Sequence, residues 1–570
     1  MQIYLIDAVG PFFECCTDRE VNWSKVPFHA LESPDGLDAQ KCAIVKEAFQ
    51  RYLSRIVALG YTAVSLDDLA HCVLHPFYPQ DLQNKLRQYQ QLYDELLVLA
   101  QAVGVQVYIN TDVTFYHESI AQHTQNKRDA IQNLFVQSVQ DLYNRFPGVA
   151  GVILRLGESD GLDVQGDFRS KLAIRSIRDC RSYIRELLQV SEQFEKFLLV
   201  RTWTLGAFQI GDLIWNTETY EAVFSGFDSD WLITSHKYGE SDFFRYLSIC
   251  PLFYEESPRK IIELQARREY EGFGAFPSFI GFDYEKYRRH LANCPSLCGI
   301  SVWSQTGGWS HFKDITFGTN SSLWNELNVY CIIRIFKESE SAERAILAFA
   351  RDYFPAANGE KLIVLLRLAD RVIKDLWYIP EFASKRLYFR RTRVPPIFWI
   401  FWDHIIINHA VRHIIRRFVL EKREAIHDGY RALDKIRKMQ EFAGEIGMDV
   451  AGFDYQYATF EIIAAAREYF FGPWNAAVAE RITRLVAQYG VKYPDGFHFL
   501  VDLMPVPLNK WLIKNIFRVS LRSHPDYRLV DRLFLLRFAS LVYPLFSLWQ
   551  KRRLPAFTRD RAMGIQILFK

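Results

Sequence analysis

Along residues 1–335, short apolar runs alternate with longer segments in which apolar residues recur every three or four positions. Apolar runs of four to eight residues bounded by turn residues are typical of buried strands, and the longer periodic segments are typical of amphipathic helices. The pattern predicts eight strands, at Ile3–Asp7, Thr62–Leu66, Val105–Asn110, Val149–Leu156, Phe197–Thr202, Trp231–Ser235, Lys260–Gln265 and Cys298–Trp303. It predicts helices at Ala39–Leu59, Leu82–Val103, Arg128–Arg145, Phe168–Leu188 and Ser322–Ile335.

This alternation of strand and helix implies a parallel sheet. Eight such units in a row predict a closed (β/α)8 TIM barrel, which belongs to the α/β fold class. A doubly wound sheet is the rival arrangement, but no G-x-G-x-x-G motif follows the first strand, so a dinucleotide-binding fold has no support. We therefore expect a catalytic barrel over residues 1–336.

From about Lys337 onward the strand signals vanish, and the pattern predicts a mainly α-helical domain over residues 337–504. The expected helices are Ala342–Tyr353, Lys361–Trp377, His404–Phe418, Glu421–Gly444, Phe460–Phe471 and Ala476–Tyr489. The tail over residues 505–570 mixes basic and aromatic residues. We expect a helical segment docked on the domain before it, with a partner surface or a membrane surface as alternatives.

Composition excludes several classes of protein. The chain has 570 residues, of which 49% are hydrophobic and 24% charged, as in a globular protein. A formal net charge of +3 gives no reason to expect a nucleic-acid partner. No signal peptide and no uncharged apolar run long enough for a transmembrane segment is visible. Nine cysteines without a framework spacing fit a reduced, cytoplasmic protein.

Polar side chains follow the predicted strands at the points where the strands end. In a barrel these ends meet at one mouth, where TIM-barrel enzymes carry their active sites. Glu158 and Asp160 come directly after the strand Val149–Leu156. Further residues of this kind are Asp7, Asp67, Asp112, Arg201, Lys237, Asp242, Glu269 and Gln305. We expect all of them to converge on the mouth.

Carboxylates that face one another in a cleft point to glycoside hydrolysis. One carboxylic acid protonates the leaving oxygen, and a carboxylate opposite activates water or attacks the sugar. Glu158 or Asp160 is the expected acid, and Asp242 and Glu269 form the expected base side. The other expected substrate-binding residues, which supply positive charge, aromatic faces and a further carboxylate, are Arg201, Lys237, Trp203, Trp303 and Asp67. For Arg201 and Lys237 the alternative is a pair of internal ion pairs at the barrel rim.

Four segments around these residues resemble the alpha-glucuronidase family of glycoside hydrolases, which removes 4-O-methyl-glucuronic acid from xylan fragments. GVILRLGESDG is similar to a family segment ending in D-S-E-G, and LLVRTW resembles V-M-W-R-A-F. HKYGESDF is close to I-K-Y-G-P-I-D-F, and IELQARREYEGF is close to E-F-Q-I-T-Q-E-Y-L-G. A weaker match is SQTGGW, where the family has A-N-T-G followed by Trp. The resemblance spans about residues 148–335.

The resemblance implies specific roles. Asp242 and Glu269 match the carboxylates that activate water, and Lys237 and Arg201 match residues that bind the carboxylate of the sugar. It further implies inversion of configuration without metal or cofactor, an alpha-linked glucuronic acid or related sugar released from an oligosaccharide substrate, and a homodimer formed through the helical domain.

This sequence departs from the family pattern at several positions. The family's acid aligns with Asp160, but we rank Glu158 slightly ahead because it has the longer side chain. Leu156 replaces a carboxylate-binding Lys, and we expect the neighbouring Arg155 to face the opposite way on a regular strand. The family's N-terminal domain has no counterpart before the first strand.

Two other functions stay open at this point. A retaining, hexosaminidase-like glycosidase would place two acidic residues after the fourth strand, which Glu158 and Asp160 permit, but it would leave Asp242 and Glu269 without a clear task. A non-catalytic carbohydrate-binding barrel would be expected to lack the two carboxylates of the base side, Asp242 and Glu269. His409 and His413 share one helix face, but without a third ligand they indicate an ordinary basic face and not a metal site.

Overall fold

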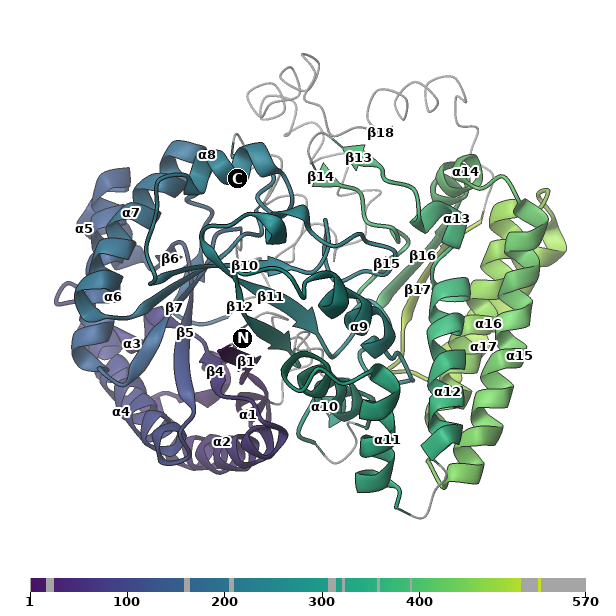
Figure 1. Cartoon of the computed structure of the whole chain (residues 1–570), viewed down its shortest axis with the longest axis horizontal. Coiled ribbons are helices and arrows are strands. Elements are labelled where there is room, and N and C mark those ends of the chain that lie inside the picture. Colours follow the sequence, from purple (N-terminus) through teal and green to yellow (C-terminus); the bar gives the residue numbers. More distant parts are fainter. Residues whose placement is uncertain are drawn as a thin grey trace.

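The computed structural model describes residues 2–16, 25–157, 165–204, 210–305, 314–319, 323–355, 359–389, 392–503 and 521–523. Eight parallel strands close into a barrel, as predicted (Figure 1). In chain order they are β1 (Ile3–Asp7), β4 (Ala63–Leu66), β5 (Gln106–Asp112), β7 (Val149–Arg155), β9 (Phe197–Arg201), β10 (Leu232–Lys237), β11 (Arg259–Gln265) and β12 (Leu297–Trp303). The barrel closes because β1 pairs with β12 on one side and with β4 on the other.

Apolar residues on alternate strand positions fill the part of the barrel interior that is nearer the amino ends of the strands. These side chains form a core of their own, separate from the larger core between strands and helices. Its members are Ile3, Leu5, Ala63, Tyr108, Ile153, Leu199, Ile233, Ile261 and Cys298. Since side chains alternate along a strand, positions two or four residues further on face the same interior nearer the carboxyl ends. Those positions carry the polar and charged residues.

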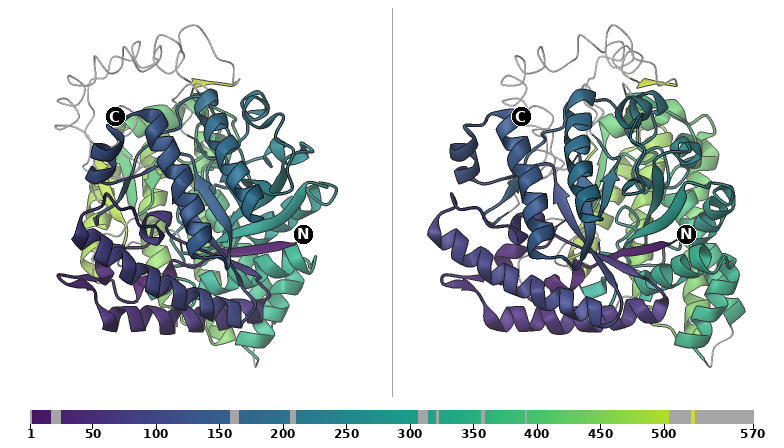
Figure 2. Two further views of the ribbon diagram at one scale, coloured as in Figure 1. Left: turned by 90° about the vertical axis from the view of Figure 1, so that its left-hand side faces the viewer. Right: turned by 60° about the vertical axis from the view of Figure 1, so that its left-hand side comes forward.

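Helices surround the barrel on its outside (Figures 1 and 2). They are α2 (Ala39–Leu59), α4 (Gln80–Ala102), α6 (Arg128–Arg145), α7 (Ile177–Phe194), α8 (Thr217–Phe224), α9 (Gly281–His290) and α10 (Leu323–Lys337). The helix predicted from Phe168 starts later than expected. Its first residues instead form β8 (Arg169–Ser170), which pairs with β6 (Phe115–Tyr116). The helix α7 begins only where Ser176 and Asp179 form a reciprocal capping box.

The chain beyond Lys337 is mainly helical, as predicted. Its larger helices are α11 (Ala342–Tyr353), α12 (Gly359–Val372), α14 (His409–Phe418), α15 (Lys422–Ile446), α16 (Ala451–Phe471) and α17 (Ala476–Lys492). A π-helical turn, η4 (Ile373–Trp377), extends α12. Figure 1 shows these helices beside the barrel, on the side of α9 and α10. Of the tail, only residues 521–523 are described.

The expectation that strands end at Lys337 is wrong. The described part of the chain after Lys337 contains six short strands: β13 (Tyr388–Phe389), β14 (Thr392–Arg393), β15 (Ile400–Phe401), β16 (His404–Asn408), β17 (His498–Asp502) and β18 (Leu521–Arg522). The segment His404–Asn408, predicted as helix, contains three consecutive β-branched isoleucines and pairs in parallel with β17. The helix starts after it because the Asn408 side chain accepts a hydrogen bond from the Val411 amide.

A buried ionic cluster joins the helical region to the barrel. Arg245 is fully buried, and its guanidinium donates to Glu271, Asp283 and Asp370, the last of these on α12. The indole of Trp377 in η4 donates to the Tyr270 carbonyl at 2.5 Å. Each of these charges has an opposite partner, which offsets the cost of burying it. Contacts with the helical region therefore fix the positions of the segments that carry Asp242 and Glu269.

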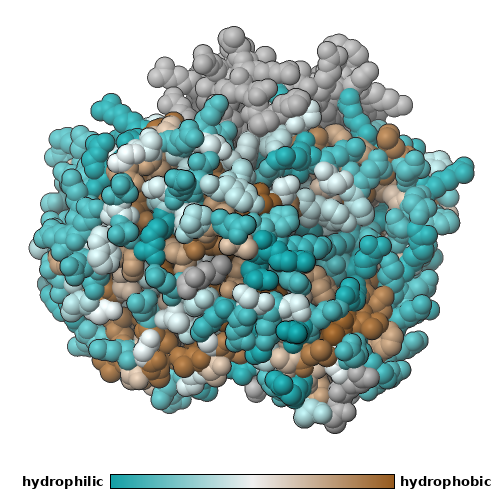
Figure 3. All heavy atoms as spheres, in the orientation of Figure 1, coloured by the Kyte–Doolittle hydropathy of each residue, from teal (hydrophilic) through white to brown (hydrophobic). Residues whose placement is uncertain are grey.

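Polar side chains dominate the face shown in Figure 3, and apolar side chains form smaller patches, one of them over α11 and α12. Leu347 and Val364 on these two helices are 36% and 42% exposed.

No helix of the described residues has the length and apolar character needed to cross a bilayer. The homodimer through the helical domain stays a prediction.

Candidate active site

An ion pair at the carboxyl end of β10 organises the first part of the mouth. The Lys237 ammonium lies 2.7 Å from Oδ1 of Asp242. The main-chain amide of Phe243 donates to the same oxygen, and the Tyr270 hydroxyl donates to Oδ2 at 2.9 Å. Asp242 therefore accepts charge-assisted hydrogen bonds at both of its oxygens, an arrangement that favours the ionised form.

Glu269 lies beside this ion pair and is 1% exposed. Its main-chain amide donates to the Gln265 side chain at 3.1 Å, which fixes the start of the loop after β11. Its Oε2 atom is buried and has no hydrogen-bond partner among the described residues. A buried carboxylate oxygen without a partner is costly, so this atom is a natural contact for a substrate group or a water molecule.

The two carboxyl groups have opposite pKa shifts. Burial would raise the pKa of Asp242, but the Lys237 charge and the hydrogen bonds from Tyr270 and Phe243 outweigh it and lower that pKa. Burial and the neighbouring Asp242 charge raise the pKa of Glu269 to about 7, against smaller opposing effects of Lys237, Gln265 and Tyr270. At neutral pH Asp242 is thus ionised, while Glu269 exchanges a proton readily. Paired carboxyls with separated pKa values are typical of acid–base sites.

A second charged group occupies the other side of the mouth. The Arg155 side chain is 1% exposed and lies 2.6 Å from Asp112 and 3.4 Å from Asp67. Lys25 pairs with the second oxygen of Asp112 at 2.5 Å. Burial opposes the ionisation of Asp112, but Arg155 and Lys25 lower its pKa to about 2. Asp67 belongs to this ion-pair cluster and also accepts a hydrogen bond from the Val26 amide, and its role as a substrate contact stays a prediction.

The predicted orientation of Arg155 is wrong. Arg155 is level with Arg201 on the neighbouring strand and points into the barrel, while Leu156 packs in the outer core. The strand β7 therefore brings a cation, Arg155, to the mouth. It lies one residue before Leu156, the position at which the alpha-glucuronidase family has a Lys. That cation contacts acidic residues of two other strands.

Arg201 is neutralised by a residue that the sequence did not single out. Its guanidinium donates to both oxygens of Glu263, at 2.9 and 3.1 Å, and it lies over the Trp303 ring at 4.3 Å. Ser235 donates to the same carboxylate at 2.9 Å. Of the two roles considered for Arg201, the contacts correspond to the internal ion pair at the rim.

Two tryptophans give the mouth aromatic surfaces. Trp303 ends β12, is partly buried, and has an indole N–H without a hydrogen-bond partner among the described residues. Trp203 follows β9 and has the Lys237 ammonium 5.5 Å from its ring centre. Gly157 lies against the Trp203 ring, where an added Cβ would come within 2.4 Å of it. The segment after β7 therefore leaves the barrel in contact with Trp203. Glu158 and Asp160, the expected acids, lie outside the described residues.

Asp7 and Gln305 meet where β1 adjoins β12. The Asp7 carboxylate accepts from the amides of Ser304 and Gln305 and from the Ser304 hydroxyl. Burial nevertheless raises the pKa of Asp7 to about 6. Burial lowers the pKa of Arg267 to about 9, against the opposing charges of Glu269 and Asp7. Arg267 thus links this corner of the mouth electrostatically to Glu269.

The sequence reasoning missed four residues of the mouth, Glu263, Tyr270, Arg155 and Arg267. Glu263 could have been found, because the alternation in KIIELQ puts it on the same strand face as Ile261. Tyr270 directly follows Glu269, but its bond to Asp242 depends on the fold and has no local signal. Among the described residues, no group of three or more His, Cys, Asp or Glu side chains is arranged to hold a metal ion. His409 and His413 contact each other through Nε2 atoms 3.0 Å apart.

No protein-family model matches the sequence, and no curated protein matches it in sequence. Solved structures do match. A GH138 enzyme targeting pectin rhamnogalacturonan II aligns with 87% of this chain and 63% of its own, with a TM-score of 0.54 and 12% identity. A family 89 glycoside hydrolase from Clostridium perfringens, in complex with PUGNAc, aligns with 77% of this chain and 51% of its own, with a TM-score of 0.43 and 10% identity.

A third match is an O-GlcNAc hydrolase mutant from Thermobaculum terrenum, aligned over 90% of this chain and 96% of its own, with a TM-score of 0.38 and 8% identity. The chain spans 63% and 51% of the first two proteins. The GH138 match shows a distantly similar fold, a TIM barrel as found in glycoside hydrolases. It does not assign a family.

The Arg201–Glu263 pair gives a test of its structural role. Arg201→Met leaves a buried carboxylate without its partner, so the free energy of unfolding should fall by about 3–5 kcal/mol. The double variant Arg201→Met/Glu263→Met removes both charges and should recover most of that loss. Urea unfolding of Arg201→Met, of Glu263→Met and of the double variant measures these changes in the free energy of unfolding. A stable Arg201→Met single variant would contradict the structural role.

Proposed function

We propose that this protein is a glycoside hydrolase that cleaves an alpha-linked sugar, glucuronic acid or a related sugar acid, from oligosaccharides. The observation that carries the proposal is the pair Asp242 and Glu269 at the carboxyl end of the barrel. One of them is held ionised by Lys237 and Tyr270, and the other has a pKa of about 7 and a buried oxygen without a partner among the described residues. The fold shared with the GH138 enzyme supports the same reaction class.

In the proposed mechanism Glu269 is the general base. A base works best when its pKa lies near the working pH, because a substantial fraction is then deprotonated and still accepts a proton strongly. Asp242, fixed by Lys237 and Tyr270, orients the water and stabilises the positive charge that develops on the sugar. Glu158, or Asp160 next to it, supplies the proton to the leaving oxygen. Single displacement by water gives inversion of configuration and requires no metal.

The proposed acidic substrate rests on three supports. Lys237 is a cation at the mouth, and while one of its N–H groups binds Asp242 another can donate to a sugar carboxylate. The sequence segments that contain it resemble the alpha-glucuronidase family. The GH138 enzyme, whose fold is distantly similar, targets pectin rhamnogalacturonan II. Arg201 is no longer part of this argument, because Glu263 already neutralises it. Trp203 and Trp303 would stack on the faces of the sugar rings.

The first prediction concerns turnover. Incubation with nitrophenyl alpha-glucuronide, alpha-galacturonide, alpha-glucoside and N-acetyl-alpha-glucosaminide should release nitrophenol from a uronide, and NMR should detect the beta anomer first. Asp242→Asn and Glu269→Gln should each lower kcat by about 10²–10⁴-fold.

Asp228→Asn and Glu256→Gln make the same chemical changes at exposed positions and should leave kcat unchanged. Cleavage with full activity in both mouth variants would contradict the assignment. Release of the alpha anomer would replace inversion with a retaining mechanism. Binding of the uronides without any cleavage would indicate the carbohydrate-binding barrel.

The second prediction concerns pH. Since the base must be deprotonated, kcat/KM should rise with pH through about 7, the pKa of Glu269. Tyr270 lowers the pKa of both carboxyls, so Tyr270→Phe should move this rise to higher pH. Tyr254 is a surface residue that is 56% exposed, so the matched variant Tyr254→Phe should leave the pH profile of kcat/KM unchanged. A rise near pH 4 in the wild type would refute Glu269 as the base.

A further inference from the structure

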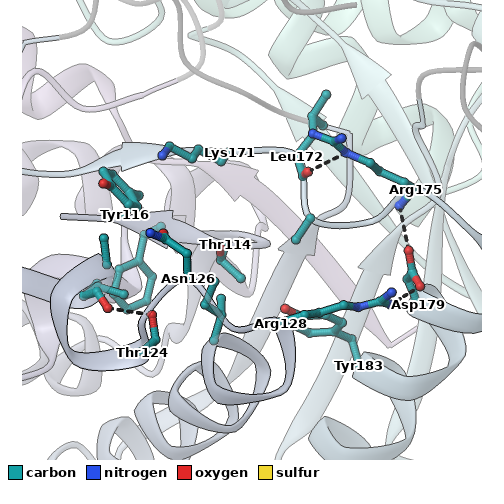
Figure 4. A pocket seen from close by; sticks show the side chains of 15 residues that line it. Thr114, Tyr116, Thr124, Asn126, Arg128, Lys171, Leu172, Arg175, Asp179 and Tyr183 are labelled. Atoms are coloured by element: carbon teal, nitrogen blue, oxygen red, sulfur yellow. Dashed lines mark hydrogen bonds and ion pairs between the residues drawn. The ribbon is translucent and has the colours of Figure 1, made fainter. Parts of the chain in front are cut away.

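A pocket lies against the β6–β8 ribbon, outside the group of charged residues that forms the mouth (Figure 4). Its volume is about 450 Å³, within the range of about 300–1,000 Å³ found for small-molecule sites. The ribbon and its extension through Thr114 and Lys171 form one wall, and α5 (Glu118–Thr124) with the first turns of α6 and α7 forms the others. No role in the proposed reaction accounts for this pocket.

The pocket and the mouth share a thin wall. Lys25 donates to Ser170 at 3.1 Å and pairs with Asp112, whose carboxylate belongs to the mouth. Lys171, the residue after Ser170, lines the pocket. The main chains of Lys171 and Thr114 exchange two hydrogen bonds, at 3.0 and 3.2 Å, which hold the backbone of Lys171 at the edge of the pocket. Lys25 therefore links the carboxylate cluster of the mouth to the strand that borders the pocket.

The lining combines an apolar floor with a polar, cationic rim. Phe115, Ile120 and Leu172 supply the floor, and the rim carries the Thr114 hydroxyl and the Asn126 amide. In Figure 4, Lys171 and Tyr116 lie on one side, and Arg175 and the Arg128–Asp179 pair lie on the other. Three cationic side chains and one carboxylate leave the lining with an excess of positive charge.

Lys171 is the cation best placed to receive a new partner. Its ammonium lies 3.3 Å from the centre of the Tyr116 ring, and it has no carboxylate partner among the described residues. Burial lowers the pKa of Lys171, as expected for an ammonium that has lost part of its water without gaining a counter-charge. An anion at this place would restore that charge balance.

We infer that this pocket is a second subsite, which binds an acidic sugar residue of the glycan through Lys171. The carboxylate of the sugar meets the ammonium, its hydroxyls meet Thr114 and Asn126, and its apolar ring face covers the floor. A simple inorganic anion would leave the floor uncovered. The inference rests on the proposed hydrolase function for the nature of its ligand.

Titration calorimetry with sodium D-galacturonate tests this directly. The full-length Trp303→Ala variant, altered at the mouth, serves as background so that the pocket dominates binding. Galacturonate should bind at one site, and D-galactose, which has the same ring without the carboxylate, should bind at least about tenfold more weakly. Added Lys171→Met should weaken galacturonate by about tenfold, the loss of one charge-assisted hydrogen bond.

Two matched variants control the charge. Lys127→Met removes an exposed lysine near the pocket that does not line it and should leave galacturonate binding unchanged. Lys171→Arg keeps the cation and should retain binding. Urea unfolding checks that each variant is folded, and since Lys171 is on the surface no large change in stability is expected.

Four results would overturn the inference: no galacturonate binding, equal binding of galactose, equal effects of Lys171→Met and Lys127→Met, or competition by acetate as strong as by galacturonate. The last result would identify a plain carboxylate site. None of these readouts requires turnover. A protein that cleaves no glycoside but passes this titration would lose the proposed function and keep the subsite, and the reverse outcome is equally distinguishable.

Discussion

Buried charge needs an opposite partner, and this constraint governs the mouth of the barrel. Closing eight parallel strands brings their carboxyl ends together, and the apolar interior ends where the charged positions begin. Lys237 forms an ion pair with Asp242, and Arg201 forms one with Glu263. Arg155 pairs with both Asp112 and Asp67. Glu269 has no cation bonded to it among the described residues, and burial together with the neighbouring Asp242 charge raises its pKa to about 7. The mouth therefore holds a carboxyl group, Glu269, that exchanges a proton near neutral pH beside the ionised Asp242, and the pKa of Asp7 is raised in the same direction, to about 6.

The helical region contributes to this arrangement from outside the barrel. Arg245 fills a fully buried space behind the mouth and binds acidic residues of the barrel segments and of α12. Trp377 bonds to the main chain of Tyr270, and the Tyr270 hydroxyl in turn bonds to Asp242. The position of the candidate base and its neighbour therefore depends on residues more than 100 positions away in the sequence. In our proposal this gives the second region a positioning role.

Much of the fold could be predicted from the sequence, because strand and helix periods are local signals. The bounds of β1, α2, α6 and α11 agree with the prediction, and all eight barrel strands are present. His404–Asn408 was misassigned because its helical continuation masked three β-branched residues that pair with a strand far along the chain. At the mouth, strand ends identified Asp242 and Glu269. The ion pair of Arg201 with Glu263 and the bond of Tyr270 to Asp242 depend on contacts across strands, for which the sequence has no local signal.

The central claim is that Asp242 is ionised throughout the neutral pH range while Glu269 titrates within it. Infrared difference spectroscopy measures this most directly, by recording the protonated carboxyl band of the wild type as a function of pH and subtracting the same series for Glu269→Gln and, separately, for Asp242→Asn. The account predicts that the Glu269 band disappears as the pH rises through about 7, while Asp242 shows no protonated band at that pH. Loss of the Glu269 band near pH 4.5, its ordinary value, would contradict the account.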